Sequence, residues 1–269
     1  ANLSWCEWAY TSPCIQAMRK WEKLSGWELD IASVGWANLA ISAAALISSI
    51  TGFGYALLAI PVLVIFLAPQ VVVPMVLMSW MPLSLLLARE AYGDIAWSKI
   101  GQWLLGAVPG MVLGAYGLAH IDEGLMRGTI GALTIAAALS VWMRPARPFV
   151  RERLLAAVAG LVSGIMAGVS GVSGPPVVLF GLNQGWDYRV LRGCLIAYFT
   201  VLHALTIAVL GNFGMVNGLT LGMAVGVLPG MFIGYLIGIR LKERIDGEHL
   251  RTLTLVVVSL AGLAAIIRH

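Results

Sequence analysis

Apolar residues in this chain form long, almost uninterrupted runs, of which residues 104–119 and 255–267 are two examples. An outer-membrane barrel would instead alternate polar and apolar positions over segments of about ten residues. In lipid, a helix satisfies its own backbone polar groups within such a run, whereas an open strand does not. The pattern therefore predicts an all-α fold, a polytopic transmembrane helical bundle.

Interruptions by polar residues, glycine and proline divide the chain into ten predicted helical segments. Two of them, 55–68 and 174–184, have fewer residues than the roughly 20 that a helix needs to cross the hydrocarbon layer. Each follows a glycine-containing break, at 49–54 and at 170–176, so we predict broken or re-entrant helices at both places. The ten predicted segments cover 31–50, 55–68, 71–88, 101–120, 125–143, 154–169, 174–184, 191–211, 218–240 and 250–267.

The two halves of the chain repeat one another. Residues 108–114 (VPGMVLG) resemble residues 228–234 (LPGMFIG), which come 120 positions later. Thr51-Gly52 and Ser170-Gly171 also correspond, at an offset of 119. Because two unrelated landmarks agree on nearly the same offset, the sequence predicts an internal duplication.

Each half contains five predicted segments, an odd number, so the second half enters the membrane from the opposite side. The expected architecture is two inverted five-segment repeats, at 31–143 and 154–269, joined by a basic linker at 144–153. Inverted repeats with broken helices are typical of secondary transporters. Pro109-Gly110 and Pro229-Gly230 stand at matching places and are expected to act as hinges or as rigid kinks.

Charged residues make up only 11% of the chain, against about 25% in an ordinary soluble domain. This shortage excludes a soluble enzyme and a disordered chain. The formal net charge of +4 is scattered between apolar runs instead of lying on one face, which excludes a nucleic-acid partner. The expected surrounding is therefore the lipid bilayer, and the sequence leaves a homo-oligomer open.

Lys and Arg are more frequent in the connections on the side of the 144–153 linker than in those on the other side. Cytoplasmic connections of membrane proteins carry such an excess. We therefore expect a multi-pass protein of the bacterial inner membrane, with the linker in the cytoplasm and both termini in the periplasm.

Residues 1–30 are expected to form an amphipathic segment at the membrane interface, with a partly ordered tail as the alternative. Ser12-Pro13 is a typical helix start, and several tryptophans in this stretch suit the interface. Cys6 and Cys14 would lie in an oxidising compartment, either as a disulfide or as free thiols. No signal peptide is expected, because no basic region followed by an apolar core and a cleavage site is visible near the start.

The two glycine-containing breaks are the candidate binding site. A helix that starts inside the membrane has unpaired N–H groups and a partial positive charge at its first turn, and such an end binds anions. Serine and threonine hydroxyls add further donors. The alternative is that small residues only let the helices pack closely. The predicted substrate-binding residues at the two breaks are Thr51, Gly52, Phe53, Gly54 and Tyr55, and Ser170, Gly171, Val172, Ser173 and Gly174.

Two further residues are candidates for substrate binding. His203 lies in the middle of segment 191–211, where it could donate to an anion, carry a coupling proton, or simply bond to a neighbouring helix as a neutral residue. Arg192 begins the same segment, where it could attract an anion or extend to the membrane interface like many arginines.

Several kinds of site are absent from the sequence. It has no nucleotide-binding P-loop and no His-Glu-x-x-His metal motif, and acidic residues are essentially missing from the segment interiors. We therefore expect no cofactor, no metal and no catalytic residue. A carboxylate proton relay is also not expected.

Four groups of residues carry a family resemblance: Thr51-Gly52-Phe53-Gly54 with Pro61, residues 168–176 (GVSGVSGPP), residues 191–193 (LRG), and Pro229-Gly230 with Gly234 and Gly238. With these residues, and over about 31–268, the chain resembles the sulfite exporter TauE/SafE family of membrane permeases. The resemblance implies transport of a sulfur-containing anion, such as sulfite or a small organosulfonate, often outward. Residues 1–30 are not part of it.

The leading hypothesis is a secondary transporter of such an anion, which would bind between the two breaks near the midplane and be released by alternating access. An anion channel that uses the same breaks is the first alternative. An intramembrane enzyme that uses His203 with a serine, and a purely structural membrane subunit, are the others.

Overall fold

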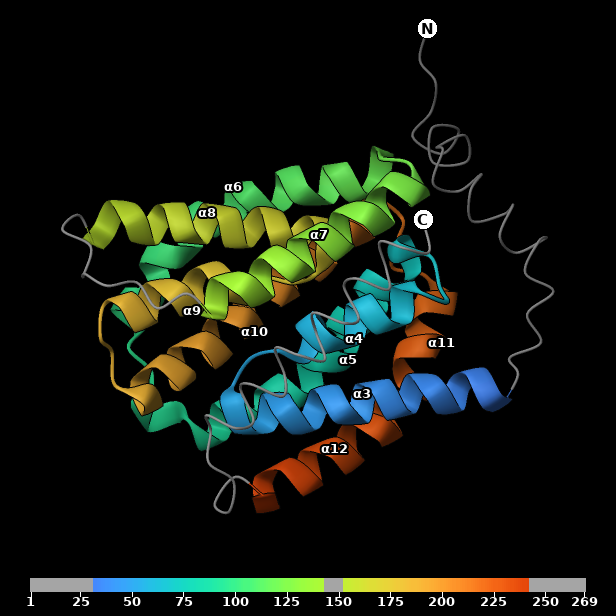
Figure 1. Ribbon diagram of the computed structural model, residues 1–269, viewed down its shortest axis with the longest axis horizontal. Coiled ribbons are helices and arrows are strands. Elements are labelled where there is room, and N and C mark those ends of the chain that lie inside the picture. The colour runs from blue at the N-terminus through green and yellow to red at the C-terminus, as the bar shows by residue number, and fades with distance from the viewer. Residues whose placement is uncertain (1–30, 143–151, 242–269) are drawn as a thin grey trace, which may run out of the picture.

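The computed structural model of the chain describes residues 31–142 and 152–241 (Figure 1). These residues form helices and short connections, without a strand among them. Six spans among the described residues are long and apolar enough to cross a membrane, and one of them, Gly218–Leu241, consists of two successive helices. This confirms the predicted all-α, multi-pass membrane fold. The predicted segments 1–30 and 250–267, and the linker up to residue 151, lie outside the described residues.

The described helices follow the predicted segments. In the first half they are α3 (Ile31–Thr51), α4 (Tyr55–Val64), α5 (Pro69–Glu90), the 3₁₀ turn η1 (Tyr92–Asp94), α6 (Trp97–His120) and α7 (Glu123–Trp142). In the second half they are α8 (Glu152–Ser170), α9 (Gly174–Asn183), α10 (Tyr188–Asn212), α11 (Gly218–Gly226) and α12 (Leu228–Leu241). The short helices α4 and α9 have 10 residues each, and every residue of α4 except Val62 is buried.

Both predicted breaks are present, and each starts at a glycine in the left-handed region. Gly52 has φ +81° and Gly171 has φ +68°, values at which a Cβ atom is strained. The hydroxyl residue before each glycine holds the turn. Thr51 Oγ1 lies 2.9 Å from the Ile47 carbonyl oxygen and accepts from the Phe53 N–H. Ser170 makes the same two bonds, to the Met166 carbonyl oxygen at 2.8 Å and from the Val172 N–H.

Two pairs of helices from opposite halves pack side by side, α6 with α8 and α3 with α12. In Figure 1, α6 and α8 both run from left to right, whereas α3 and α12 both run from right to left. Glycine lets the two backbones approach closely in both pairs, but the pairs differ in which of their helices carry the glycines. In the first pair glycines come from both helices, at Gly106, Gly110 and Gly114 of α6 and at Gly160, Gly164 and Gly168 of α8. In the second pair they come from α12 alone, at Gly230, Gly234 and Gly238.

The predicted segment 218–240 is two helices rather than one, and the break has a specific cause. The Asn38 side chain of α3 lies between the two ends: its Nδ2 donates to the Gly226 carbonyl oxygen at 3.0 Å, and its Oδ1 accepts from the Gly230 N–H at 2.8 Å. In a continuous helix these two backbone groups would bond to each other. The inserted side-chain amide therefore interrupts the backbone hydrogen bonds between α11 and α12. Proline alone does not do this, because α6 is continuous through Pro109.

Candidate functional site

A narrow cavity lies where α4 and α9 begin, between the two glycine-containing breaks. The first turns of these two short helices form two of its walls, and single side chains of α5 and α10 form the rest. Among the residues that the structure describes, no Asp, Glu, Lys or Arg lines it. Its lining residues are Phe53, Gly54, Tyr55, Ala56, Leu57, Trp80, Val172, Ser173, Gly174, Pro175, Phe199 and His203.

The start of α4 offers the cavity unpaired backbone donors. The first hydrogen bond of this helix runs from the Leu58 N–H to the Gly54 carbonyl oxygen, and no side chain caps the end. The N–H groups of Tyr55, Ala56 and Leu57 therefore lack an acceptor among the described residues. Together with the helix dipole, these three donors make this end attractive to an anion.

The start of α9 is different, because Pro175 and Pro176 have no N–H group. Among the first three residues of α9, Gly174 is the one that has a backbone N–H group, and the Ser173 hydroxyl lies beside it in the cavity wall. The helix dipole still points its positive end at the cavity. The two walls are thus alike in the direction of the helix dipole but differ in their donors: the start of α4 provides three amides, and the start of α9 provides the Gly174 amide and the Ser173 hydroxyl.

Trp80 of α5 and Phe199 of α10 occupy corresponding places in the two halves, at the offset of 119, and both line the cavity. The Trp80 indole is 2% exposed, and its Nε1 has no hydrogen-bond partner. Its ring also packs against Tyr55, whose hydroxyl lies 2.8 Å from Ser79 Oγ. Trp80 therefore brings a buried N–H donor that nothing in the described structure satisfies.

His203 of α10 is held by a chain of hydrogen bonds that reaches the second break. Its Nε2 lies 2.9 Å from Ser173 Oγ, and its ring stacks on Phe199 with the centroids 5.7 Å apart. The Ser173 carbonyl oxygen accepts from Ser163, whose Oγ in turn accepts from the Tyr198 hydroxyl. His203 is 5% exposed, and its Nδ1 has no hydrogen-bond partner in the described part of the chain.

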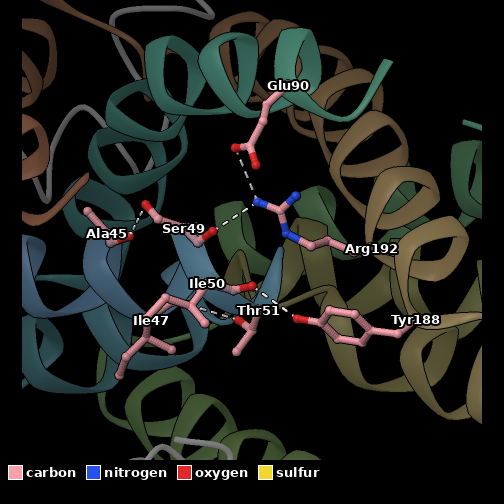
Figure 2. Close-up of polar contacts among 8 residues, drawn as sticks. All are labelled: Ala45, Ile47, Ser49, Ile50, Thr51, Glu90, Tyr188 and Arg192. Carbon is pink, nitrogen blue, oxygen red and sulfur yellow. Dashed lines mark hydrogen bonds and ion pairs between the residues drawn. The ribbon is translucent and has the colours of Figure 1, made fainter. Parts of the chain in front are cut away.

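Arg192 lies at the end of α3, outside the cavity lining (Figure 2). Its Nη2 donates to the Ser49 carbonyl oxygen at 2.9 Å and lies 3.5 Å from Glu90 Oε2. Tyr188, one turn earlier on α10, donates to the Ile50 carbonyl oxygen at 3.0 Å. These side chains satisfy carbonyl groups that the last turn of a helix leaves unpaired, and a cation suits that end of the dipole.

Comparison with known proteins places the chain in a family. The family model described as sulfite exporter TauE/SafE matches residues 37–265. The chain belongs to this family. A curated relative from Cupriavidus necator, named "Probable sulfite/organosulfonate exporter TauE", is 29% identical over 112 residues. That match covers 40% of this chain and 43% of the relative. No solved structure matches the chain.

The structure divides the predicted site residues of this TauE/SafE family member into two groups. Seven of them line the cavity: Phe53, Gly54, Tyr55, Val172, Ser173, Gly174 and His203. Five do not: Thr51, Gly52, Ser170, Gly171 and Arg192. The members of the second group build the breaks or anchor them, because their polar atoms bond to nearby backbone or their φ angles form the turns.

Sequence reasoning left Trp80 open between lining the cavity and simple packing, and the structure places it in the lining; it assigned no role to Phe199 or to the Ser163–Tyr198 bond. The sequence repeat did contain a signal for Trp80 and Phe199, because both are aromatic and they are 119 positions apart, the offset of the repeat. For the bond between Ser163 and Tyr198 the sequence held none. Among the residues that the structure describes, no three His, Cys, Asp or Glu side chains gather as a metal site.

Proposed function

We propose that this TauE/SafE family member is a secondary transporter that carries a small sulfur-containing anion, such as sulfite or an organosulfonate, out of the cell across a bacterial inner membrane. The observation that carries the proposal is the cavity between the starts of α4 and α9. It has unsatisfied donors, two positive helix ends and no acidic lining residue. A tetrahedral or pyramidal oxyanion presents several acceptors that such a set of donors can satisfy.

The proposed binding residues come from both breaks. The amides of Tyr55, Ala56 and Leu57 would donate to the anion from one side, and the Ser173 hydroxyl and Gly174 amide from the other. The Trp80 N–H and His203 would complete the shell. Because the cavity is narrow, we expect the half-buried Phe53 ring to move aside when the anion enters.

Alternating access is proposed to come from two inverted repeats. The helices α3, α4 and α5 correspond in order and bounds to α8, α9 and α10 at the offset of 119, and α6 corresponds to the α11–α12 pair. The opposite directions of the α3–α12 and α6–α8 pairs in Figure 1 support an inverted relation. The linker would then lie in the cytoplasm and both termini in the periplasm. The proposal includes no covalent chemistry and no cofactor.

Transport assays in proteoliposomes test this function. Purified protein is reconstituted, and efflux of labelled sulfite and labelled sulfoacetate is measured with and without unlabelled anion on the opposite side. A carrier is expected to show saturable flux that is accelerated by the anion on the opposite side. Flux without this acceleration, together with single-channel currents, would show an anion channel instead, and no flux of either compound would contradict the proposal.

A further inference from the structure

Among the cavity-lining residues that the structure describes, His203 is the one whose side chain can gain a proton near neutral pH. The other ionisable lining residue is Tyr55, whose neutral phenol can lose a proton but does not gain one. The imidazole is 5% exposed and stacks on Phe199. The indole of Trp80 meets it edge-on, with the centroids 6.3 Å apart. His203 has no counterpart in the first half, where Ser84 stands at the corresponding position and bonds to the Met81 carbonyl oxygen.

The helices that pack on α10 bring no carboxylate to His203. α9 has no ionisable residue, and α4 contributes Tyr55, which is bonded to Ser79. On α10 itself, Tyr198 is bonded to Ser163. The other ionisable groups of α10 and of the elements that pack on it lie outside the cavity lining. They are Arg89 and Glu90 of α5, Tyr92 and Asp94 of η1, Lys99, Tyr116 and His120 of α6, Glu152 and Arg153 of α8, and Tyr188, Arg189, Arg192 and Cys194 of α10.

A single charge is costly in such a site, whether it is an imidazolium or an anion. An imidazolium and a monovalent anion together reduce this cost for each other, because the pair attracts and has no net charge. The geometry supplies the contacts for both protonation states of the ring. Nε2 bonds to Ser173 Oγ, and Nδ1 has no protein partner, so it is available to donate to a ligand once both nitrogens carry hydrogen.

We propose that His203 is the proton-binding site of the transporter, so that one proton is bound with each anion. This inference rests on the proposed function. A proton from solvent adds to the neutral imidazole as the anion enters, the imidazolium donates to the anion, and no bond in the substrate is broken. Because proton and anion each favour binding of the other, the affinity for an anion of fixed charge rises about tenfold for each pH unit of acidification while His203 is neutral in the free protein.

Isothermal titration calorimetry in two buffers of different ionisation enthalpy measures the number of protons bound with each anion. Methanesulfonate is the first probe, because its sulfonate stays ionised over the range from weakly acidic to weakly alkaline pH. Sulfite is the second, with its own protonation determined in a blank titration. For the wild-type protein in detergent we expect uptake close to one proton per anion and the tenfold dependence of affinity on pH.

His203→Gln is the test variant, since its side-chain amide can still bond to Ser173. It is expected to bind the probe with no proton uptake and with an affinity that does not change with pH. His120→Gln is the matched control, because His120 lies at the exposed end of α6 and bonds to the Tyr116 carbonyl oxygen. This control should keep both the uptake and the pH dependence of the wild type.

Three outcomes separate the inference from the function on which it rests. Binding by the wild type without proton uptake would overturn the role of His203 and leave the transporter proposal intact. Uptake that persists in the His203→Gln variant would assign the proton to another group. Failure of the wild type to bind either probe, with no transport in proteoliposomes, would overturn both. The wild-type stoichiometry decides the first case even where the variant fails to fold.

Discussion

At the scale of single residues, Trp80 and Trp103 form a natural comparison. Both bury an indole Nε1 that has no hydrogen-bond partner, but Trp80 alone lines the cavity. If the indole N–H of Trp80 donates to the bound anion, Trp80→Phe removes a charge-assisted hydrogen bond while keeping a ring in place. We expect the affinity for sulfite to fall by roughly 10- to 100-fold, as loss of about 1.5–3 kcal/mol implies.

Trp103→Phe is the control for that substitution. The Trp103 ring packs against Phe180, Trp186 and Tyr198, away from the cavity, so its loss of an N–H should leave the affinity within about twofold of wild type. Equal affinities for the wild type and the Trp80→Phe variant in calorimetric titrations would remove Trp80 from the proposed binding shell.

Gly52 allows a second comparison at the residue scale. A Cβ atom at this position would lie 2.6 Å from Cγ of Arg192, and the φ of +81° is strained for any L side chain. Gly185 has a similar φ of +65° but open space around it. We expect Gly185→Ala to lower stability by about 1–2 kcal/mol through the backbone alone, and Gly52→Ala to lower it by a further 1–3 kcal/mol through crowding.

Thermal unfolding in detergent, followed by tryptophan fluorescence, measures both glycine variants against wild type. The ranking is the decisive result: a Gly52→Ala variant no less stable than Gly185→Ala would show that the Arg192 side chain gives way without cost.

At the scale of helices, the end of α3 is anchored by a buried side chain of α10. Arg192→Met removes the donor to the Ser49 carbonyl oxygen, leaving a buried acceptor unsatisfied at a cost of about 1–3 kcal/mol. Glu90→Gln keeps that bond and removes the negative charge from the 3.5 Å ion pair, whose Glu90 side chain is 38% exposed. Since half-exposed ion pairs contribute about 1 kcal/mol or less, this variant should be the milder one.

The same unfolding assay ranks the two anchor variants, with the wild type as the reference. Added salt should reduce the effect of Glu90→Gln more than that of Arg192→Met, because screening acts on exposed charges. A larger loss of stability for Glu90→Gln would mean that the ion pair between α5 and α10 stabilises the protein more than the bond from α10 to Ser49 of α3.

Helix bounds could be predicted from the sequence because they follow from the local pattern, whereas the break between α11 and α12 could not. Apolar runs and glycine-containing breaks are local signals, and the starts of α4 and α9 follow directly from them, although α4 ends at Val64, before the predicted residue 68. The break depends on Asn38, which lies 188 positions from the carbonyl that it contacts. The corresponding residue of the other half is Ala157, which has no amide to insert, and α6 stays continuous there.

The candidate site divides in the same way. Glycine and hydroxyl residues identify the breaks, but their spacing does not reveal that Thr51 and Ser170 turn their hydroxyls onto their own helices. That outcome depends on rotamers that the turn selects. Arg192 is similar: its position at the start of α10 is readable from sequence, while its bond to Ser49 of α3 requires the packed structure.

At the scale of the whole molecule, the two helix pairs differ in register by one turn. Gly110 of α6 meets the Leu161 carbonyl oxygen of α8. By the sequence repeat, Gly230 corresponds to Gly110, and Ser42 corresponds to Leu161. Gly230 does not pack on Ser42, however, but on the carbonyl oxygen of Asn38, four positions earlier in α3. Four residues are about 6 Å along a helix. Two pairs of similar helices in one molecule thus pack in two different registers, as expected of a structural element with two discrete arrangements.

We expect the α3–α12 pair to be the one that slides during transport. The α6–α8 pair has glycines on both helices, so backbones interlock from both sides, whereas α3 places Ile41, Ala45 and Ser49 where α8 has glycine.

Spin labels at Leu39 and Ile233, exposed positions of α3 and α12, should therefore give a distance distribution that shifts by several Å, up to about one helical turn, when sulfite is added. Labels at Leu105 and Val158 of α6 and α8 are the matched control and should keep one distribution. Pulsed electron paramagnetic resonance on variants with the native cysteines replaced measures both pairs. A shift confined to the α6–α8 pair would reverse the assignment of moving and fixed helices, and no shift in either pair under any anion concentration would rule out sliding as the basis of alternating access.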